Sequence, residues 1–374
     1  MIVYSVLLFW IILCAVIPKY HFQYGNTSIM SGRILYLWVS FLAIGIIMAL
    51  RSPTVGTDTL AYSHYFINIS YANNIEEAAN ASFIPSTAFN IFLYILGKIS
   101  INPQLYIFCI SLIITVGMAR FIYYTSDNIP ISVFLFLTLN LFFIALNAGR
   151  QWVSIVLALN AFVCWWKNIK SRWGWIIFFI ACSVHNATLS FLPALIGIYL
   201  VKHSYTYKKI LSISILGTII LAFLFFVVSG IFIDYFPHYA MYLDDTSQDN
   251  LIENTGQGKI IMLYIMFLGI VGLYSIAAWC HRIQYNETIT YAMIPGSVFC
   301  SIIGIIFSQN TMMNRILLPY QCFFLILIPT ALSTFNKRMS ILLYFIIGIG
   351  LLSSYYLWMY SNLGDILPYH FYFE

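Results

Sequence analysis

Three arginines lie where apolar segments of the chain begin or end, namely Arg51, Arg150 and Arg315. An arginine at the centre of a bilayer costs about 2.5–3.5 kcal/mol, so it usually faces a cavity, a partner or the membrane interface. A guanidinium suits a phosphate group, because its planar fork donates two parallel hydrogen bonds and stays charged. The three arginines therefore predict one shared anion-binding site. The alternative is three separate arginines that extend to the interface.

The residues after Arg51 indicate a turn that carries a carboxylate. Pro53 blocks the continuation of a helix, and Gly56 permits a tight turn. Asp58 follows this turn, where it could cap the next helix. It could equally serve a sugar-binding site, as a base or as an acceptor of hydroxyl hydrogen bonds. Tyr62 lies about one helical turn later and is an aromatic candidate for the same site.

The other two arginines also have hydrogen-bonding neighbours. Arg150 precedes Gln151 at a break between two apolar runs, which an asparagine and a glycine mark. Arg315 follows Asn314, and Tyr320 lies about one turn further along the same segment. These neighbours favour a polar site over isolated interface arginines.

His185 lies between two short apolar segments, 173–184 and 187–201. Each segment is too short to cross about 30 Å of hydrocarbon comfortably. Basic loops flank the pair on both sides, and both loops should face the cytoplasm. Residues 173–201 are therefore predicted to form a broken helical hairpin whose tip lies in a protein-lined cavity. At that position His185 is either a general base, for which a pKa near 6.5 is suitable, or a structural histidine.

The composition shows what kind of protein must position these residues. Of the 374 residues, 61% are apolar and only 8% are charged, whereas a soluble domain carries about 25% charged residues. This excludes a water-soluble enzyme, and the scattered basic residues do not form a nucleic-acid-binding patch. The seven cysteines lie in apolar runs without metal-site spacing. We expect no metal and no cofactor.

The sequence predicts an all-α polytopic membrane protein with a single transmembrane domain over residues 1–374. Alternating segments typical of a barrel are not seen. A further apolar segment, 84–100, is predicted to be a short helix that dips into the membrane. Hydropathy predicts about twelve transmembrane helices: 2–18, 33–50, 105–124, 131–146, 150–166, 173–184, 187–201, 209–233, 259–280, 290–308, 316–334 and 339–360.

The charge distribution predicts which side of the membrane carries the arginines. The predicted cytoplasmic loops hold 12 of the 17 basic residues and 2 of the 12 acidic ones, as the positive-inside rule requires. The three arginines then lie on the outer side, together with two hydrophilic stretches, 51–82 and 234–258. The acidic stretch 234–258 is either a lid over a cavity or a solvated connector.

Five motifs, in order along the chain, resemble signatures of the EpsG-like, Wzy-type polysaccharide polymerases of bacteria. They are the run from Arg51 to Tyr65 with its Val-Gly-Thr-Asp-Thr-x-x-Tyr core, Arg150-Gln151, His185 in its short hairpin, Arg315 before Ile316-Leu317-Leu318-Pro319-Tyr320, and Leu367-Pro368-Tyr369-His370-Phe371.

This resemblance implies a reaction at the outer face of the bacterial cytoplasmic membrane. Such enzymes join oligosaccharide repeat units carried on undecaprenyl pyrophosphate, and the product is O-antigen, capsule or exopolysaccharide. The lipid-linked units would be donor and acceptor, without nucleotide, metal or cofactor. A chain-length regulator and a flippase are further partners that the resemblance suggests.

The resemblance also implies roles for the candidate residues. Arg150 and Arg315 would hold the pyrophosphate, with Gln151 and Asn314 beside them, and Arg51 would support either that group or Asp58. His185 or Asp58 would accept the proton of the attacking hydroxyl. Three tyrosines would contact sugars or phosphate oxygens, although tyrosines are more often core or interface residues: Tyr62, Tyr320 and Tyr369.

Three other functions remain open from the sequence. A flippase for lipid-linked oligosaccharides would need polar groups near the middle of the membrane and access from both sides. The charged groups lie mostly at segment ends on one side, which favours an enzyme. An O-antigen ligase differs only in its acceptor, so a substrate test must separate it from a polymerase. A scaffold protein without catalytic activity is the third alternative.

Overall fold

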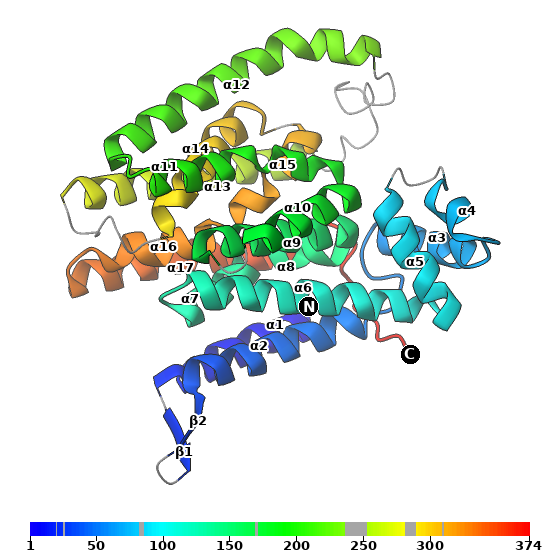
Figure 1. Cartoon of the computed structure of the whole chain (residues 1–374). Helices are drawn as coiled ribbons and strands as arrows, with labels where there is room; N and C mark the ends of the chain where they lie inside the picture. The colour runs from blue at the N-terminus through cyan, green and yellow to red at the C-terminus, as the bar shows by residue number, and fades with distance from the viewer. Residues whose placement is uncertain are drawn as a thin grey trace. The chain divides into compact units, whose positions relative to one another are not determined.

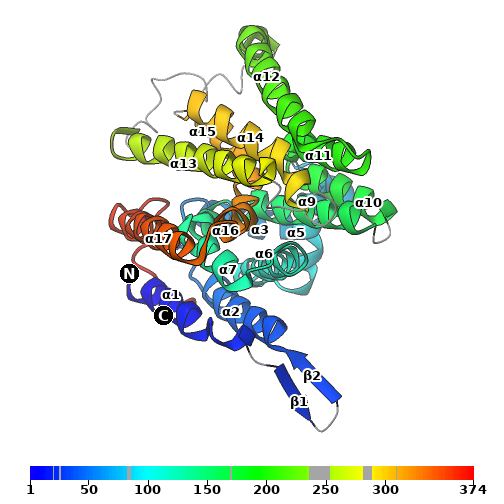
Figure 2. The ribbon, with the colours of Figure 1, turned by 90° about the vertical axis from the view of Figure 1, so that its left-hand side faces the viewer.

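The computed structural model describes residues 1–19, 21–24, 27–81, 86–168, 171–235, 253–280, 289–308 and 310–374 (Figures 1 and 2). Contacts divide the chain into two compact units. Unit 1 comprises residues 1–188 and 345–374, and unit 2 comprises residues 189–344. Each unit is described by itself below.

Unit 1 is built from helices and one small β-hairpin. The hairpin pairs β1 with β2 in antiparallel register, and it lies between the predicted segments 2–18 and 33–50. The elements of unit 1 are α1 (Ile2–Cys14), η1 (Ile17–Lys19), β1 (His21–Tyr24), β2 (Thr27–Ser31), α2 (Gly32–Ala49), α3 (Thr59–Ser70), α4 (Ile75–Ala79), α5 (Thr87–Ile99), α6 (Pro103–Thr125), α7 (Ile129–Thr138), α8 (Leu141–Asn147), α9 (Gly149–Lys167) and α10 (Ser171–Val184).

Every regular element among the described residues of unit 2 is a helix. Two elements, η2 and α17, begin in one unit and end in the other. The elements are η2 (Asn186–Phe191), α11 (Leu192–Lys202), α12 (Tyr207–Tyr235), α13 (Glu253–Trp279), α14 (Thr290–Ile306), α15 (Thr311–Gln321), α16 (Phe324–Ser333) and α17 (Lys337–Tyr360).

The described helices support a polytopic membrane protein, but the expected count of about twelve spans is not confirmed. Five helices are long and apolar enough to cross a membrane: α2, α6, α12, α13 and α17. Two bent helix pairs raise the count to seven if each pair is one span. Five further apolar helices have only 10–17 residues, whereas a span needs about 20. Hydropathy alone could not show that these segments stop short.

The breaks within predicted spans occur at specific residues. The predicted span 131–146 is the pair α7 and α8, which bend by 55° at Asn140, a residue with left-handed backbone (φ = +62°). The predicted span 316–334 is the pair α15 and α16, bent by 49°. Asparagine tolerates the left-handed region better than most residues, which explains why the first break lies there.

The predicted segment 150–166 lies at the buried centre of unit 1. It corresponds to α9, most of whose residues are buried, including Trp152 at 0% exposure. Gly117 of α6 lets the two helices approach closely, because a Cβ there would lie 2.8 Å from Val156. The Asn160 amide also donates to the Gly117 carbonyl at 3.0 Å. A helix buried in this way can carry polar groups that a lipid-facing helix could not.

Two other expectations can be compared with the described helices, and whether α5 dips into the membrane stays a prediction. The short helix expected at 84–100 is α5, of 13 residues, and α10 ends at Val184 just before the predicted break at His185. Within the hydrophilic stretch 51–82 the chain forms α3 and α4. Most of the acidic stretch 234–258 lies outside the described residues.

Candidate functional site

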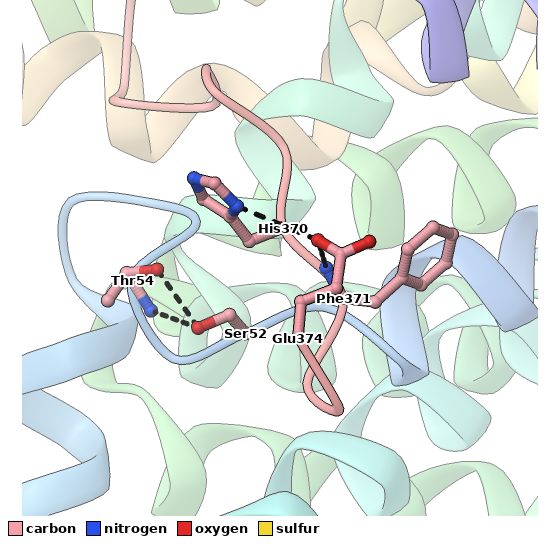
Figure 3. Close-up of polar contacts among 5 residues, drawn as sticks. All are labelled: Ser52, Thr54, His370, Phe371 and Glu374. Carbon is pink, nitrogen blue, oxygen red and sulfur yellow. Dashed lines mark hydrogen bonds and ion pairs between the residues drawn. The ribbon is translucent and has the colours of Figure 1, made fainter.

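The segment after α2 is held in place by the C-terminal segment of the chain. Arg51 and Phe371 form an antiparallel β-bridge. On either side of it, the Ser52 amide donates to the His370 carbonyl at 2.9 Å, and the Tyr372 amide donates to the Leu50 carbonyl at 2.8 Å. Figure 3 shows the two segments side by side. The first and last candidate motifs, 320 residues apart in the chain, therefore share one structure within unit 1.

The Arg51 side chain is enclosed and ties helices together, although its Nε, like that of Arg150, has no described acceptor. It is 1% exposed, and its guanidinium donates to the carbonyls of Met48 and of Leu146, the latter at 3.2 Å. It also donates to the Ser111 hydroxyl at 3.4 Å. Burial lowers its pKa, but an arginine starts so high that it keeps its charge. Arg51 thus joins the ends of α2 and α8 to α6.

Asn147, at the end of α8, locks the turn that precedes Asp58. Its Oδ1 accepts a hydrogen bond from the Thr57 amide at 2.8 Å. Two glycines with positive φ enclose it: Gly56 (φ = +102°) and Gly364 (φ = +82°). A Cβ at Gly56 would lie 2.9 Å from the Asn147 Oδ1, and one at Gly364 would lie 2.0 Å from its Nδ2. Only glycine fits these positions, both for space and for conformation.

Asp58 immediately precedes α3, the position that a capping residue would occupy. However, its side chain makes no capping hydrogen bond to the helix, and it is half-buried. Tyr62 lies one turn later, half-buried, with its ring edge-on to Phe89 at 6.0 Å between centroids. The carboxylate thus makes no capping bond to α3, and its role at a sugar-binding site stays a prediction.

Arg150 and Gln151 begin α9, three and four residues after Asn147. Gln151 is buried at 6% exposure, and Arg150 is half-buried. Within the described part of the chain, no acceptor reaches the enclosed Nε of Arg150. The α9 N-terminus also has no side-chain cap. A helix N-terminus favours an anion, and a guanidinium beside it strengthens that preference.

His185 lies in unit 1 at the break between α10 and η2. Its Nδ1 accepts a hydrogen bond from the Ala187 amide at 3.3 Å, so the neutral imidazole carries its proton on Nε2. Nearby, the Thr188 hydroxyl contacts Ser154. Ser154 lies four residues after Arg150 and therefore on the same face of α9. This contact places the His185 turn beside the N-terminal half of α9.

The fourth motif lies in unit 2 and forms its own polar network. The Asn314 side chain donates through Nδ2 to the Ser308 carbonyl at 2.9 Å. Its Oδ1 accepts from the Tyr264 hydroxyl at 2.9 Å. Gln321 donates to the same hydroxyl at 3.1 Å. Arg315 follows on α15 with an exposed side chain. The network thus orients α15, and the arginine extends from it.

Two of the candidate tyrosines use their hydroxyls inside the protein. Tyr320 is 0% exposed, donates to the Ser190 carbonyl and stacks on Phe191 with centroids 5.5 Å apart. Tyr369 donates to the Ile47 carbonyl at 2.9 Å, and burial raises its pKa to about 12. These contacts match the alternative that we gave for tyrosines, a core role.

The structure thus gathers four motifs in unit 1 and places the fourth in order, around Arg315, in unit 2. Among the described residues there is no cluster of three or more His, Cys, Asp and Glu side chains that could hold a metal. Sequence reasoning treated Asn147 only as part of a break and did not select Ser154, Tyr264 or Gln321. Their polar side chains inside apolar runs were the available signal.

A comparison with protein families gives one match. The model of the EpsG family matches residues 34–371, a range that includes every candidate from Arg51 to Tyr369. No curated protein and no solved structure matches the chain. Because the family match covers nearly the whole chain and all five motifs, the protein belongs to the EpsG family of Wzy-type polysaccharide polymerases.

Proposed function

We propose that this protein polymerises oligosaccharide repeat units carried on undecaprenyl pyrophosphate, at the outer face of the bacterial cytoplasmic membrane. The observation that carries the proposal is the start of α9. There the half-buried Arg150, with an enclosed Nε that no described acceptor reaches, lies beside uncapped backbone amides. A pyrophosphate ester supplies the acceptor oxygens that these donors require.

In the proposed reaction, a hydroxyl of the acceptor unit attacks the first sugar of the growing chain. The new glycosidic bond forms as the bond between that sugar and its pyrophosphate breaks, and undecaprenyl pyrophosphate leaves with the bonding electron pair. Arg150 stabilises the charge that develops on the leaving group, which is often the largest contribution to catalysis. Gln151 supports the same group, and a role of Arg315 and Asn314 in holding the pyrophosphate stays a prediction from the resemblance.

The proton of the attacking hydroxyl goes to Asp58 in this proposal. The bond from the Ala187 amide to Nδ1 leaves His185 with a proton on Nε2, so neutral His185 donates more readily than it accepts. Asp58 makes no capping bond, and the Thr57 amide next to it ties its turn to the end of α8. His185 then acts as a donor to a phosphate or sugar oxygen, and Tyr62 lines the sugar side.

The test uses purified protein in liposomes with its native undecaprenyl-pyrophosphate-linked repeat unit, without nucleotide sugar or added metal. A ladder of products on a gel is the expected result. An unchanged band would contradict the polymerase. Movement of the lipid across the bilayer would then indicate a flippase, and transfer to a different acceptor would indicate a ligase.

The choice of base can be tested in the same assay. Asp58→Asn should lower kcat by at least about 100-fold, within the range for loss of a general base. His185→Gln, which keeps a donor near the Nε2 position, should retain more activity than His185→Ala. Full activity of Asp58→Asn would transfer the role of base to another residue.

A further inference from the structure

We propose that the groove between α2 and α6 holds the polyprenyl tail of the lipid-linked substrate. The proposal rests on the proposed function and adds a binding site for the lipid portion. The groove has a volume of about 650 Å³ and lies wholly within unit 1. Figures 1 and 2 show the two helices side by side.

Hydrogen bonds fix the groove at both ends. At one end the Gln104 amide donates to the Ala49 carbonyl. At the other end the Arg33 guanidinium donates to the Ser126 carbonyl at 2.8 Å. The two helices are antiparallel, and these hydrogen bonds join them at both ends. The space between the two ends therefore has a defined width.

Small residues hollow the groove, and large apolar residues form its walls. Gly45 adds space to the groove because it has no side chain. A Cβ there would lie 3.5 Å from Thr115, in ordinary contact and without a clash. Ala49 and Ala119 are further small lining residues. The walls are exposed apolar side chains: Trp38 at 67%, Leu42 at 62%, Phe108 at 49%, Leu112 at 52% and Val116 at 54%.

The dimensions of the groove suit an extended hydrocarbon chain. Its lining runs along α2 from Ile34 to Leu50, which is about 24 Å at 1.5 Å per residue. This length is close to the roughly 30 Å of a bilayer core. A long apolar chain anchored at one membrane surface would fill such a groove along most of its length.

The position of the groove distinguishes a substrate tail from an ordinary phospholipid chain. Its end at Leu50 is one residue from Arg51 and thus continuous with the segment that leads to Asp58. At the opposite end, the Arg120 guanidinium is already engaged, by Asn160 Oδ1 at 2.5 Å and by the Tyr124 ring at 5.2 Å. A headgroup at the Leu50 end would lie near the start of α9, because Arg51 donates to the Leu146 carbonyl, four residues before Arg150. That is where the proposed reaction needs the pyrophosphate.

The experiment fills the groove and varies the length of the substrate tail. Gly45→Leu should raise KM for the undecaprenyl-linked unit by about tenfold, because the new side chain displaces part of the tail. KM for the same unit on a short prenyl tail should change less than twofold. The matched control is Gly348→Leu on α17, where no described atom lies within 4 Å of the added Cβ.

Two outcomes of this experiment overturn the groove: unchanged KM values for Gly45→Leu, or equal increases for both substrates. A binding measurement independent of polymerisation separates this failure from failure of the proposed function. A photoreactive undecaprenyl phosphate, in vesicles of phosphatidylethanolamine and phosphatidylglycerol, should label peptides that contain Leu42 and Leu112. Excess undecaprenyl phosphate should prevent the labelling. Equal competition by added phospholipid would overturn the proposal.

Discussion

The segment after α2 and the start of α15 each present an arginine among hydrogen-bonding residues, yet they use it in opposite ways. Arg51 is 1% exposed and bound to backbone carbonyls. Arg315 is exposed, while its neighbour Asn314 bonds within the protein. In the first region the arginine stabilises the fold, and in the second the fold positions an exposed arginine. Arginine in an apolar sequence therefore does not by itself identify a ligand site.

Arg150 lies between these extremes, and it should give the largest effect on activity. Arg150→Ala should lower kcat by about 100- to 1,000-fold, the cost of losing a preorganised donor to a developing anion. Initial rates in liposomes at equal protein level are the measurement. Arg150→Lys should recover only part of the rate, because lysine lacks the planar fork.

The control for Arg150 lies on the same helix. Lys167→Ala removes an exposed charge at the other end of α9 and should leave the rate unchanged. Equal activity of Arg150→Ala and Lys167→Ala would remove Arg150 from the site.

Arg51 and Arg315 should separate stability from activity. Arg51→Met leaves the carbonyls of Met48 and Leu146 without their donor and should lower the free energy of unfolding by about 3 kcal/mol. Thermal unfolding in detergent measures this loss. Arg315→Met should leave the unfolding temperature unchanged and lower the polymerisation rate about tenfold or more. The reverse pattern would invert the comparison.

Asn147 tests whether the turn before Asp58 depends on the end of α8. Asn147→Ala removes two hydrogen bonds, the exposed one from the Thr57 amide and the one to the Phe143 carbonyl, while the Thr57 amide keeps the Gly364 carbonyl at 3.2 Å. This loss should cost about 1–2 kcal/mol. Asn147→Asp keeps an acceptor at Oδ1 and should retain more of the stability. Thermal unfolding compares the two variants, and identical losses would show that the volume of the side chain matters more than this bond.

Tyr369 should give the smallest effect. Tyr369→Phe removes one hydrogen bond to the Ile47 carbonyl and should cost about 0.5–1.5 kcal/mol of stability. Product ladders should be unchanged in length and amount at a temperature where the variant stays folded. A lost ladder with unchanged thermal unfolding would instead return Tyr369 to the substrate site.

The sequence by itself determined the class of the protein and the positions of its breaks. High hydropathy predicted a helical membrane protein, and local turn-forming residues placed the breaks before Arg150 and at His185. These features depend on residues close together in the chain, where helix period and backbone preference act. The ordered motifs predicted the family that the match over residues 34–371 confirms.

Tertiary structure decided which candidate side chains are available. No local pattern indicates that residue 371 pairs with residue 51, or that Arg51, Tyr320 and Tyr369 bond to backbone carbonyls. Nor does hydropathy distinguish α9, which protein buries, from a lipid-facing helix. Burial and hydrogen bonding depend on segments that are distant in the chain. For that reason the sequence could name three similar arginines, and only the fold separated the structural one from the others.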